Sequence, residues 1–138
     1  MNILEIPFVK KVGIEKQASN MLSLKFSEGI KNHLETIHAS AQFTLAETAS
    51  GEKLLESFPS LVGKVVPILR ESKVKFKKPA TKSISAKSII SSESIEKFNS
   101  QFTTKGRSTV PVEVEISDSD GKITCIGTFI WYIQSNEQ

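Results

Sequence analysis

Two periodicities of apolar side chains divide the first part of the chain into strands and a helix. Residues 21–27 (MLSLKFS) alternate apolar and polar positions, which is the period of a half-buried strand. A weaker alternation over residues 9–17 predicts another strand before it. Residues 39–57 contain no proline and carry apolar side chains around the whole helical axis, so we predict a long, largely buried helix that ends before Pro59.

Alternation resumes after the predicted helix and indicates a pair of strands. Over residues 73–77, lysines alternate with the apolar Val74 and Phe76, and residues 84–90 continue the pattern after the turn-like Pro79. A short connection is typical of an antiparallel hairpin, so we expect these two strands to pair with each other.

A short helix and a second hairpin complete the pattern. Apolar side chains recur at i, i+3 and i+7 over residues 95–102, behind a serine pair that can cap a helix. Residues 109–116 and 122–133 then form apolar-rich strands on either side of an Asp-Gly turn, and Pro111 favours a sheet edge or a bulge. Because all connections between neighbouring strands are short, we predict an α+β domain with an antiparallel sheet.

The composition is typical of one globular domain and excludes several other classes. The chain has 138 residues, 38% hydrophobic and 24% charged, so we interpret residues 1–138 as a single domain. Its longest apolar run, residues 123–133, is shorter than the ~20 residues that a membrane-spanning helix needs. Glu5 and Pro7 stand where a secretory signal is apolar, so we expect a cytoplasmic protein without a membrane partner.

Cysteine and histidine are too few for a disulfide framework or a structural zinc site. Cys125 is the only cysteine, and the only histidines are His33 and His38. We therefore expect no metal, with only a carboxylate-held magnesium ion left open. Cys125 falls within an apolar strand pattern, which favours an inert core thiol over a nucleophile.

Positive charge is concentrated in one stretch, although the net charge is only +3. Residues 64–87 hold eight lysine and arginine side chains and one acidic side chain, Glu71. Such a field attracts a phosphate-bearing ligand, and the alternative is a solvated strand face. Nucleic acid is disfavoured because Phe76 is the only aromatic side chain among these lysines that could stack on a base.

The start of the predicted helix carries an acidic side chain in unusual surroundings. Glu47 falls in the third turn and shares a helical face with Ser40, Phe43 and Gly51. A buried carboxylate is costly unless it is paired, protonated or functional, and no lysine or arginine lies three or four residues away from it. Periodicity alone leaves two interpretations open, a structural glutamate and a catalytic one.

The residues around Glu47 resemble the signature of a known enzyme family. The signature is approximately N-x-x-G-x-x-H-G-G-x-x-F-x-L-A-[DE], and it belongs to hot-dog-fold acyl-CoA thioesterases of the phenylacetyl-CoA and 4-hydroxybenzoyl-CoA type. Six positions of this chain match it at the family's spacing: Asn32, His38, Phe43, Leu45, Ala46 and Glu47. The resemblance implies a hot-dog fold, in which an antiparallel sheet wraps around a long central helix, and hydrolysis of an acyl-CoA thioester.

The resemblance also implies roles for individual residues. Glu47 matches the general base or nucleophile, and the backbone N–H of Ala39 matches the donor that polarises the thioester carbonyl at the helix N-terminus. His38 matches a residue that helps to hold the thioester, with simple helix capping as the alternative. Asn32 matches a residue that orients water or substrate, with turn stabilisation as the alternative. Three further residues are expected to contact the substrate: Ser40, Phe43 and Thr48. Thr48 is also expected to form a hydrogen bond beside the Glu47 carboxylate.

Three positions depart from the family pattern. Glu35 occupies the usual position of the first glycine, and Ala39 and Ser40 replace the glycine pair. The Cβ of Ala39 narrows the approach to its N–H, which would reduce activity or move it to other acyl groups. If Glu35 turned inward, it would raise the pKa of Glu47 by like-charge repulsion, whereas a solvent-facing Glu35 would have no effect.

The resemblance gives the basic stretch a ligand and the chain a partner. Coenzyme A enters as part of the substrate, so no separate cofactor is implied, and its phosphates are expected near Lys77 and Lys78, then near Lys82 and Arg107. The family's site lies between subunits, which implies a homodimer or a dimer of dimers. The alternative function is a non-catalytic acyl or acyl-CoA binding protein. A hydratase of the same fold is disfavoured because the chain has no D-x-x-x-x-H spacing.

Overall fold

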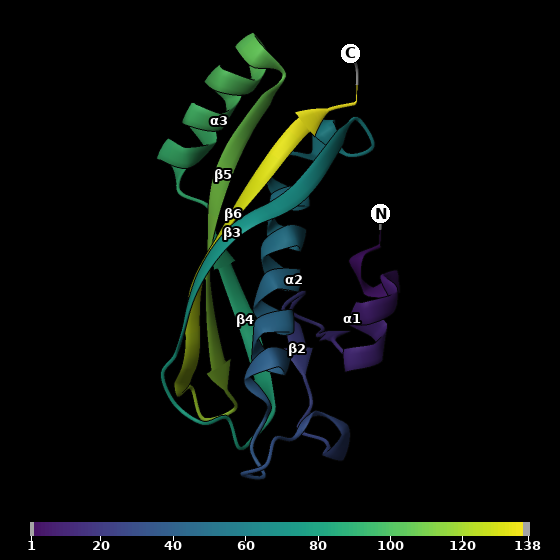
Figure 1. The fold of residues 1–138 in the computed structure, drawn as a ribbon, viewed down its shortest axis with the longest axis vertical. Helices are drawn as coiled ribbons and strands as arrows, with labels where there is room; N and C mark the ends of the chain where they lie inside the picture. Colours follow the sequence, from purple (N-terminus) through teal and green to yellow (C-terminus); the bar gives the residue numbers. More distant parts are fainter. Residues whose placement is uncertain (1, 137–138) are drawn as a thin grey trace.

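A single antiparallel sheet curves around one long helix in the computed structural model, which describes residues 2–136 (Figure 1). The helices are α1 (Pro7–Val12), α2 (Ala39–Ser57) and α3 (Ser92–Lys105). The strands are β1 (Glu15–Lys16), β2 (Leu22–Leu24), β3 (Val65–Phe76), β4 (Ile84–Ile89), β5 (Arg107–Asp118) and β6 (Ile123–Ser135). Short 3-10 turns cover Ile3–Glu5, Glu28–Ile30 and Pro59–Leu61.

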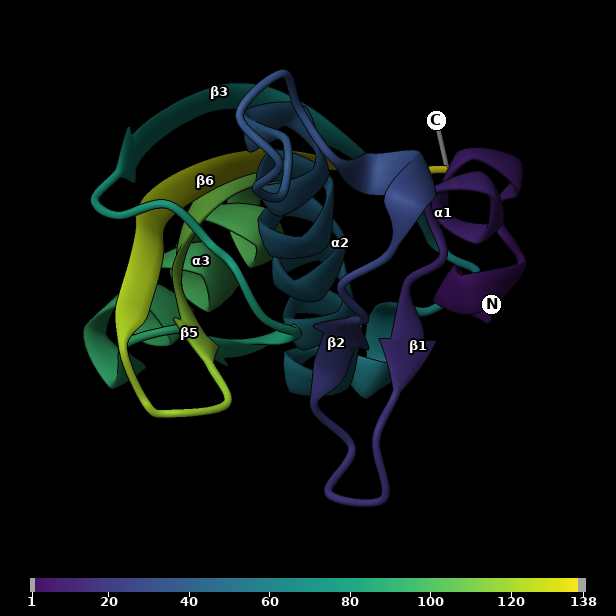
Figure 2. The same cartoon turned by 90° about the horizontal axis from the view of Figure 1, so that it is seen from below.

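The sheet order is β1-β2-β4-β5-β6-β3, and every neighbouring pair is antiparallel. Seen from the end of the sheet, its strands surround α2, which runs through the middle of the molecule (Figure 2). The predicted α+β hot-dog fold, an antiparallel sheet wrapped around a long central helix, is therefore confirmed. The predicted helix over residues 39–57 is confirmed as α2.

Small side chains let α2 lie close to the sheet, and two buried hydrogen bonds hold it there. The hydroxyl of Thr124 on β6 donates to Gln42 Oε1 over 2.8 Å, and the indole N–H of Trp131 donates to Ser50 Oγ over 2.9 Å. At Gly51 a Cβ would lie 3.3 Å from the Trp131 ring, so only glycine fits without displacement. These contacts fix the rotation of α2 about its own axis.

The predicted hairpin between residues 73–77 and residues 84–90 is wrong. β3 pairs with β6 along its whole length, and β4 lies between β2 and β5. The connecting residues 77–83 instead cross the end of the sheet, where Ala80 O accepts a hydrogen bond from Ile37 N over 2.9 Å. The 13-residue β6 offers β3 a longer partner than the six-residue β4.

The predicted strand over residues 9–17 is also wrong for most of its length. A six-residue helix, α1, precedes the two-residue strand β1. Pro7 stands at the first turn of this helix, and Gly13 ends it in the left-handed region at φ +96°. Proline at the start and glycine just past the end are helix boundaries, and these two residues outweigh the weak alternation between them.

The second half of the chain follows its prediction. α3 begins at the serine pair, where Ser91 Oγ accepts from Ser94 N, and β5 and β6 form the expected hairpin. Pro111 lies beyond the last β4–β5 pair, Ile89 with Glu113, so β5 has only β6 beside it there. The expected edge position of this proline is confirmed. Within residues 2–136, no helix combines the length and apolarity needed to cross a bilayer.

Candidate active site

One backbone N–H at the start of α2, that of Ala39, has no hydrogen-bond acceptor among the described residues. His38 caps the helix, because its Nδ1 accepts from Ser40 N over 3.0 Å and its carbonyl accepts from Ala41 N and Gln42 N. The N–H of Ala39 has no acceptor within residues 2–136, and Ala39 is exposed. A helix N-terminus carries about half a positive charge, so this free N–H suits a negatively charged oxygen.

Glu47 lies two turns further along α2. Its carboxylate is partly buried and has no ion pair or hydrogen bond within the described residues, and this burial raises the pKa of Glu47 above its usual range. Phe43, on the same face of the helix, packs against Phe129 of β6 with ring centroids 5.6 Å apart. A carboxylate with a raised pKa and no partner is a feature of functional sites.

A cleft of about 420 Å³ adjoins the start of α2. Two predicted site residues, His38 and Ser40, line it. The remaining walls come from α1, from the turn before α2 and from the first turns of α2 itself: Phe8, Lys11, Val12, Gly29, Ile30, Lys31, Ala41 and Thr44. The α1 side of this cleft was not expected from the sequence, because the pattern of residues 9–17 predicts a strand there. The helix boundary residues Pro7 and Gly13 were the signal that could have found it.

Asn32 holds the turn that leads into the site. Its Oδ1 accepts from Leu34 N and Thr36 N, and its Nδ2 donates to Thr36 Oγ1 over 2.8 Å. These bonds match the turn-stabilising interpretation of Asn32. They use both lone-pair directions of Asn32 Oδ1 and one of the two N–H bonds of its Nδ2.

Glu35 faces solvent. Its side chain is 74% exposed and forms an ion pair with Lys31, which also pairs with Glu28. Burial, and no neighbouring charge, therefore raises the pKa of Glu47. The backbone of Glu35 is left-handed, with φ +62°, at the position where the family signature has glycine. Glycine adopts this conformation without strain, which gives the signature's preference a physical reason.

The hydrogen bond expected from Thr48 beside the Glu47 carboxylate is wrong. Thr48 is buried, and its hydroxyl has no hydrogen-bond partner within the described residues. Successive helical residues point about 100° apart, so Thr48 leaves the face that Glu47 occupies.

Lys77 and Lys78 lie at the same end of the molecule as the start of α2. Both backbone amides donate to Thr124 O, and the hydroxyl of Thr124 bonds Gln42 in the first turn of α2. Both side chains are exposed. Lys82 forms an ion pair with Asp120 at the turn between β5 and β6.

Arg107 does not join these lysines within the chain, so the expected grouping of Arg107 with Lys77 and Lys78 is not seen. It begins β5, which starts beside α3 and ends at the end of the sheet where α2 begins (Figure 1). A 12-residue strand spans about 40 Å, so Arg107 lies at the far end of the sheet. Periodicity gives the position of a residue along a strand but not the end of the sheet to which it belongs.

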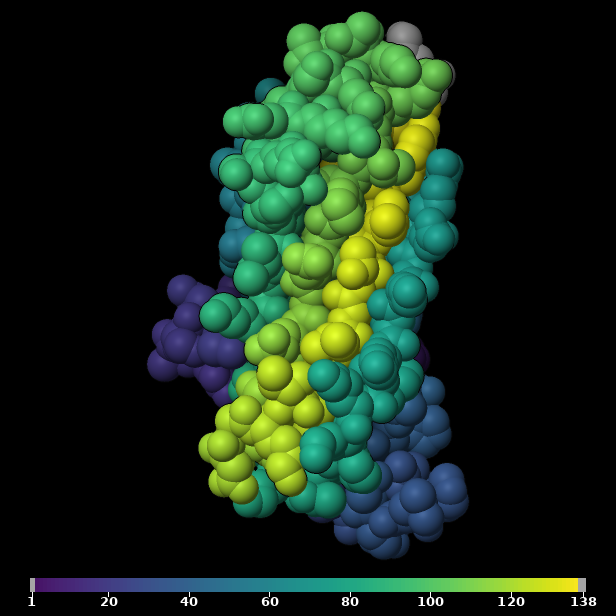
Figure 3. All heavy atoms as spheres, turned by 90° about the vertical axis from the view of Figure 1, so that its left-hand side faces the viewer, coloured from purple at the N-terminus to yellow at the C-terminus, as the bar shows by residue number. Residues whose placement is uncertain are grey.

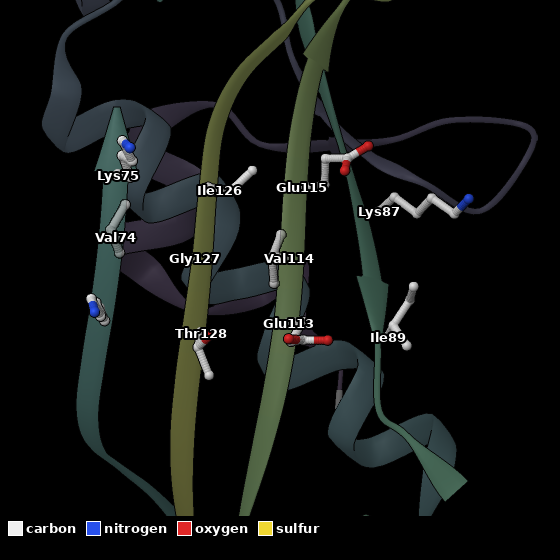
Figure 4. Close-up of a pocket in the computed structure, with 11 residues that line it drawn as sticks. Val74, Lys75, Lys87, Ile89, Glu113, Val114, Glu115, Ile126, Gly127 and Thr128 are labelled. Atoms are coloured by element: carbon white, nitrogen blue, oxygen red, sulfur yellow. The ribbon is translucent and has the colours of Figure 1, made fainter. Parts of the chain in front are cut away.

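Much of the remaining basic stretch meets acidic or aromatic side chains. Figure 3 shows the outer face of the sheet. A groove of about 630 Å³ on that face is lined by Lys73, Lys75 and Lys87 together with Glu113 and Glu115. Figure 4 shows Lys75 and Lys87 on strands that flank the two glutamates. The Arg70 guanidinium lies over the Tyr132 ring, 4.1 Å from its centroid. This face is the far side of the sheet from α2, and its mixed charge disfavours a polyphosphate ligand.

Cys125 is fully buried, and burial raises the pKa of its thiol to about 11. The expected core position of Cys125 is therefore confirmed, and the raised pKa favours an inert thiol. His33 is exposed on the turn before α2. In the part of the chain that the structure describes, no group of three or more His, Cys, Asp or Glu side chains could hold a metal ion.

Comparison with known proteins gives one family match. A family model described as "Domain of unknown function (DUF4442)" matches residues 6–133. No curated protein matches the sequence significantly.

Several solved structures share the fold. A Pseudomonas aeruginosa protein of unknown function, PA5026, described as a probable thioesterase, is 25% identical with a TM-score of 0.83, covering 97% of this chain and 91% of that chain. Thioesterase HI1161 from Haemophilus influenzae is 13% identical with a TM-score of 0.76, covering 99% of this chain and 88% of its own. BH2602 from Bacillus halodurans, in a crystal structure with CoA, is 20% identical with a TM-score of 0.71, covering 91% and 74% respectively.

Replacing the strained residue in the turn before α2 is expected to stabilise the protein. Glu35→Gly removes a side chain from a left-handed backbone position, which we expect to raise the free energy of unfolding by about 1 kcal/mol. Thermal unfolding should show a melting temperature a few degrees higher. Asn20, at φ +71°, is the matched control, because asparagine tolerates this conformation and Asn20→Gly should gain less. An unchanged or lower melting temperature for Glu35→Gly would contradict the strain.

Proposed function

We propose that this chain, which belongs to the DUF4442 family, is a thioesterase that hydrolyses acyl-CoA. The observation that carries the proposal is the pair of groups on α2, an unpartnered Ala39 N–H and an unpaired Glu47 carboxylate two turns away. The descriptions of PA5026 and HI1161 support thioester hydrolysis, and the CoA in the BH2602 structure supports this type of substrate.

The free N–H of Ala39 is the proposed oxyanion donor. It would donate to the thioester carbonyl oxygen as negative charge develops there, with the positive end of α2 behind it. His38 helps in two ways. Its Nδ1 occupies the neighbouring Ser40 N–H, which leaves Ala39 as the available amide. A neutral ring that accepts at Nδ1 carries its proton on Nε2, which can donate to the bound thioester.

Glu47 is the proposed general base. Eight residues separate it from Ala39, about 12 Å along the helix axis, and helical side chains lean toward the N-terminus, which shortens this gap. A water molecule between them would attack the carbonyl carbon and pass its proton to Glu47. The C–S bond then breaks, and the departing CoA thiolate takes up the proton. Attack by the carboxylate itself is the nucleophilic version of the same assignment.

The phosphates of coenzyme A are assigned to Lys77 and Lys78. Both side chains are exposed at the end of the sheet where α2 begins, and neither forms an ion pair within the described residues. Asp120, at the turn between β5 and β6 at this same end of the sheet, is already paired with Lys82. A phosphate would therefore find two uncompensated positive charges close to the proposed oxyanion donor.

The proposed assembly is a homodimer, or a dimer of dimers, joined through the edge strand β3. One side of β3 pairs with β6, and its other side has no strand beside it. Exposed apolar side chains mark this edge, among them Ile68 at 52% exposure and Phe76. A long edge strand with unpaired backbone groups and exposed apolar side chains can pair with another strand, and a second β3 would satisfy it. The unpartnered Glu47 supports a site that one chain leaves incomplete.

The alternative is a non-catalytic acyl-CoA binding protein, favoured by alanine and serine at the signature's glycine pair. Free-thiol release from short, medium, long and aromatic acyl-CoAs separates the two functions. Binding without turnover on any substrate would favour the alternative.

Replacing the proposed base is expected to slow the reaction. Glu47→Gln cannot accept a proton, so kcat should fall by about 10²–10⁴ while KM changes little. Glu56→Gln, on the exposed side of the same helix, is the matched control and should keep kcat. Wild-type turnover in Glu47→Gln would remove the catalytic assignment.

The same variant should be more stable near neutral pH. The folded pKa of Glu47 lies above its unfolded value, so its charge destabilises the fold as pH rises through that interval. Glutamine removes this destabilisation, and the melting temperature at pH 7 should rise. A structural glutamate would instead give a lower melting temperature with kcat intact.

Reversing the two proposed phosphate-binding lysines should weaken substrate binding. We expect Lys77→Glu with Lys78→Glu to raise KM at least about tenfold while kcat changes little, because ground and transition states share the phosphate contacts. The matched control reverses the charge of two lysines on α3, Lys97→Glu with Lys105→Glu, at the far end of the sheet. An unchanged KM at low and high salt would assign both lysines to the solvated face.

Blocking the β3 edge should give monomers. Ile68→Lys places like charges close together across a β3–β3 pair, and light scattering at micromolar concentration should report half the wild-type mass or less. A wild-type monomer with full activity would overturn the proposed assembly.

A further inference from the structure

The cleft beside the start of α2 has an apolar wall that nothing in the described chain covers. Phe8 on α1 lines it and is 62% exposed, with Val12 and Ile30 nearby. Figures 1 and 2 both place α1 next to α2, away from the β5 and β6 side of the sheet. Small side chains of α2, Ala41 and Thr44, form the opposite wall. The cleft is therefore an apolar groove between two helices.

The cleft opens beside the free amide of α2. His38 and Ser40, the residues on either side of Ala39, both line it. Ser40 also shares a helical face with Glu47, whereas Ala41 and Thr44 lie on the neighbouring face. A thioester carbonyl held at the Ala39 N–H would thus have Glu47 on one side and the cleft on the other.

The charges that line the cleft fit an anionic amphiphile. No aspartate or glutamate lines it, and its two cations, Lys11 and Lys31, lie on different elements. Lys31 is held by Glu28 and Glu35, which leaves Lys11 without an ion pair among residues 2–136. At about 420 Å³ the cleft is in the size range of sites that bury small apolar ligands.

The geometry points to this cleft as the binding site for the acyl chain, with Phe8 and Ala41 as the residues that set chain-length preference. This inference rests on the proposed thioesterase function for the placement of the thioester. It adds the substrate class, acyl groups whose apolar chain fits a cleft of about 420 Å³, and it assigns α1 to substrate binding.

Binding measurements on a non-hydrolysing background test the cleft directly. In Glu47→Gln, isothermal titration with acetyl-CoA and with octanoyl-CoA gives the contribution of the chain to affinity. Adding Phe8→Ala should weaken octanoyl-CoA about tenfold, because the chain loses most of one aromatic contact, and leave acetyl-CoA unchanged. Adding Ala41→Leu fills the groove and should have the same selective effect. Phe8 is exposed, so its variant tests the cleft even if Ala41→Leu does not fold.

The matched control is Leu34→Ala, which removes an equally exposed apolar side chain, at 68% exposure, from the turn outside the cleft. It should leave both affinities unchanged. Equal losses for both ligands in Phe8→Ala, or no loss for either, would overturn the acyl site. If octanoyl-CoA affinity falls selectively but the wild-type protein hydrolyses no acyl-CoA, the acyl site stands and the proposed function is overturned. Hydrolysis with a chain-length preference that Phe8→Ala and Ala41→Leu do not change would keep the proposed function and overturn the acyl site.

Discussion

The close approach of α2 to the sheet is the constraint on which the rest of the structure depends. A Cβ at Gly51 would lie only 3.3 Å from the Trp131 ring, and the buried hydrogen bonds from Thr124 and Trp131 fix the helix in rotation. An unpaired donor in this interior would cost about 1–3 kcal/mol, so the arrangement is specific. With that rotation fixed, Glu47 lies on the same helical face as Phe43, which packs against Phe129 of β6, and its partial burial raises the pKa of its carboxyl group.

The hydrogen bonds of the backbone amides at the start of α2 make this end of the helix a candidate site. The His38 side chain and carbonyl satisfy the next three amides, and Ala39 alone keeps a free N–H. The turn before it depends on Asn32 and on a strained Glu35 backbone, which together deliver His38 to the capping position. Substrate chemistry and helix capping are therefore compatible roles for His38, because they use different nitrogens of one ring.

Strand pairing brings acidic side chains from distant segments close to several basic residues of the 64–87 stretch. Eight basic residues in one stretch suggest a strong positive field. In the folded chain, Lys82 meets Asp120, and Lys73 and Lys75 share a groove with Glu113 and Glu115 from a distant segment. Lys77 and Lys78 are the lysines of this stretch that lie near the start of α2 with no ion pair or groove partner among the described residues, so the phosphate hypothesis now depends on these two side chains.

The sequence by itself determined the elements whose signals are local. The long helix over residues 39–57, α3 and the last hairpin follow from periodicity, capping serines and an Asp-Gly turn, and the position of Glu47 relative to Ala39 follows from helical spacing alone. Tertiary structure decided what depends on partners distant in sequence. It paired β3 with β6 and placed Arg107 at the far end of the sheet. It also left the Thr48 hydroxyl without a hydrogen-bond partner among residues 2–136, and it set α1 beside α2 as one wall of a cleft. Pairing and packing energies come from contacts between segments that no local window compares, which is why these features could not be predicted from the pattern.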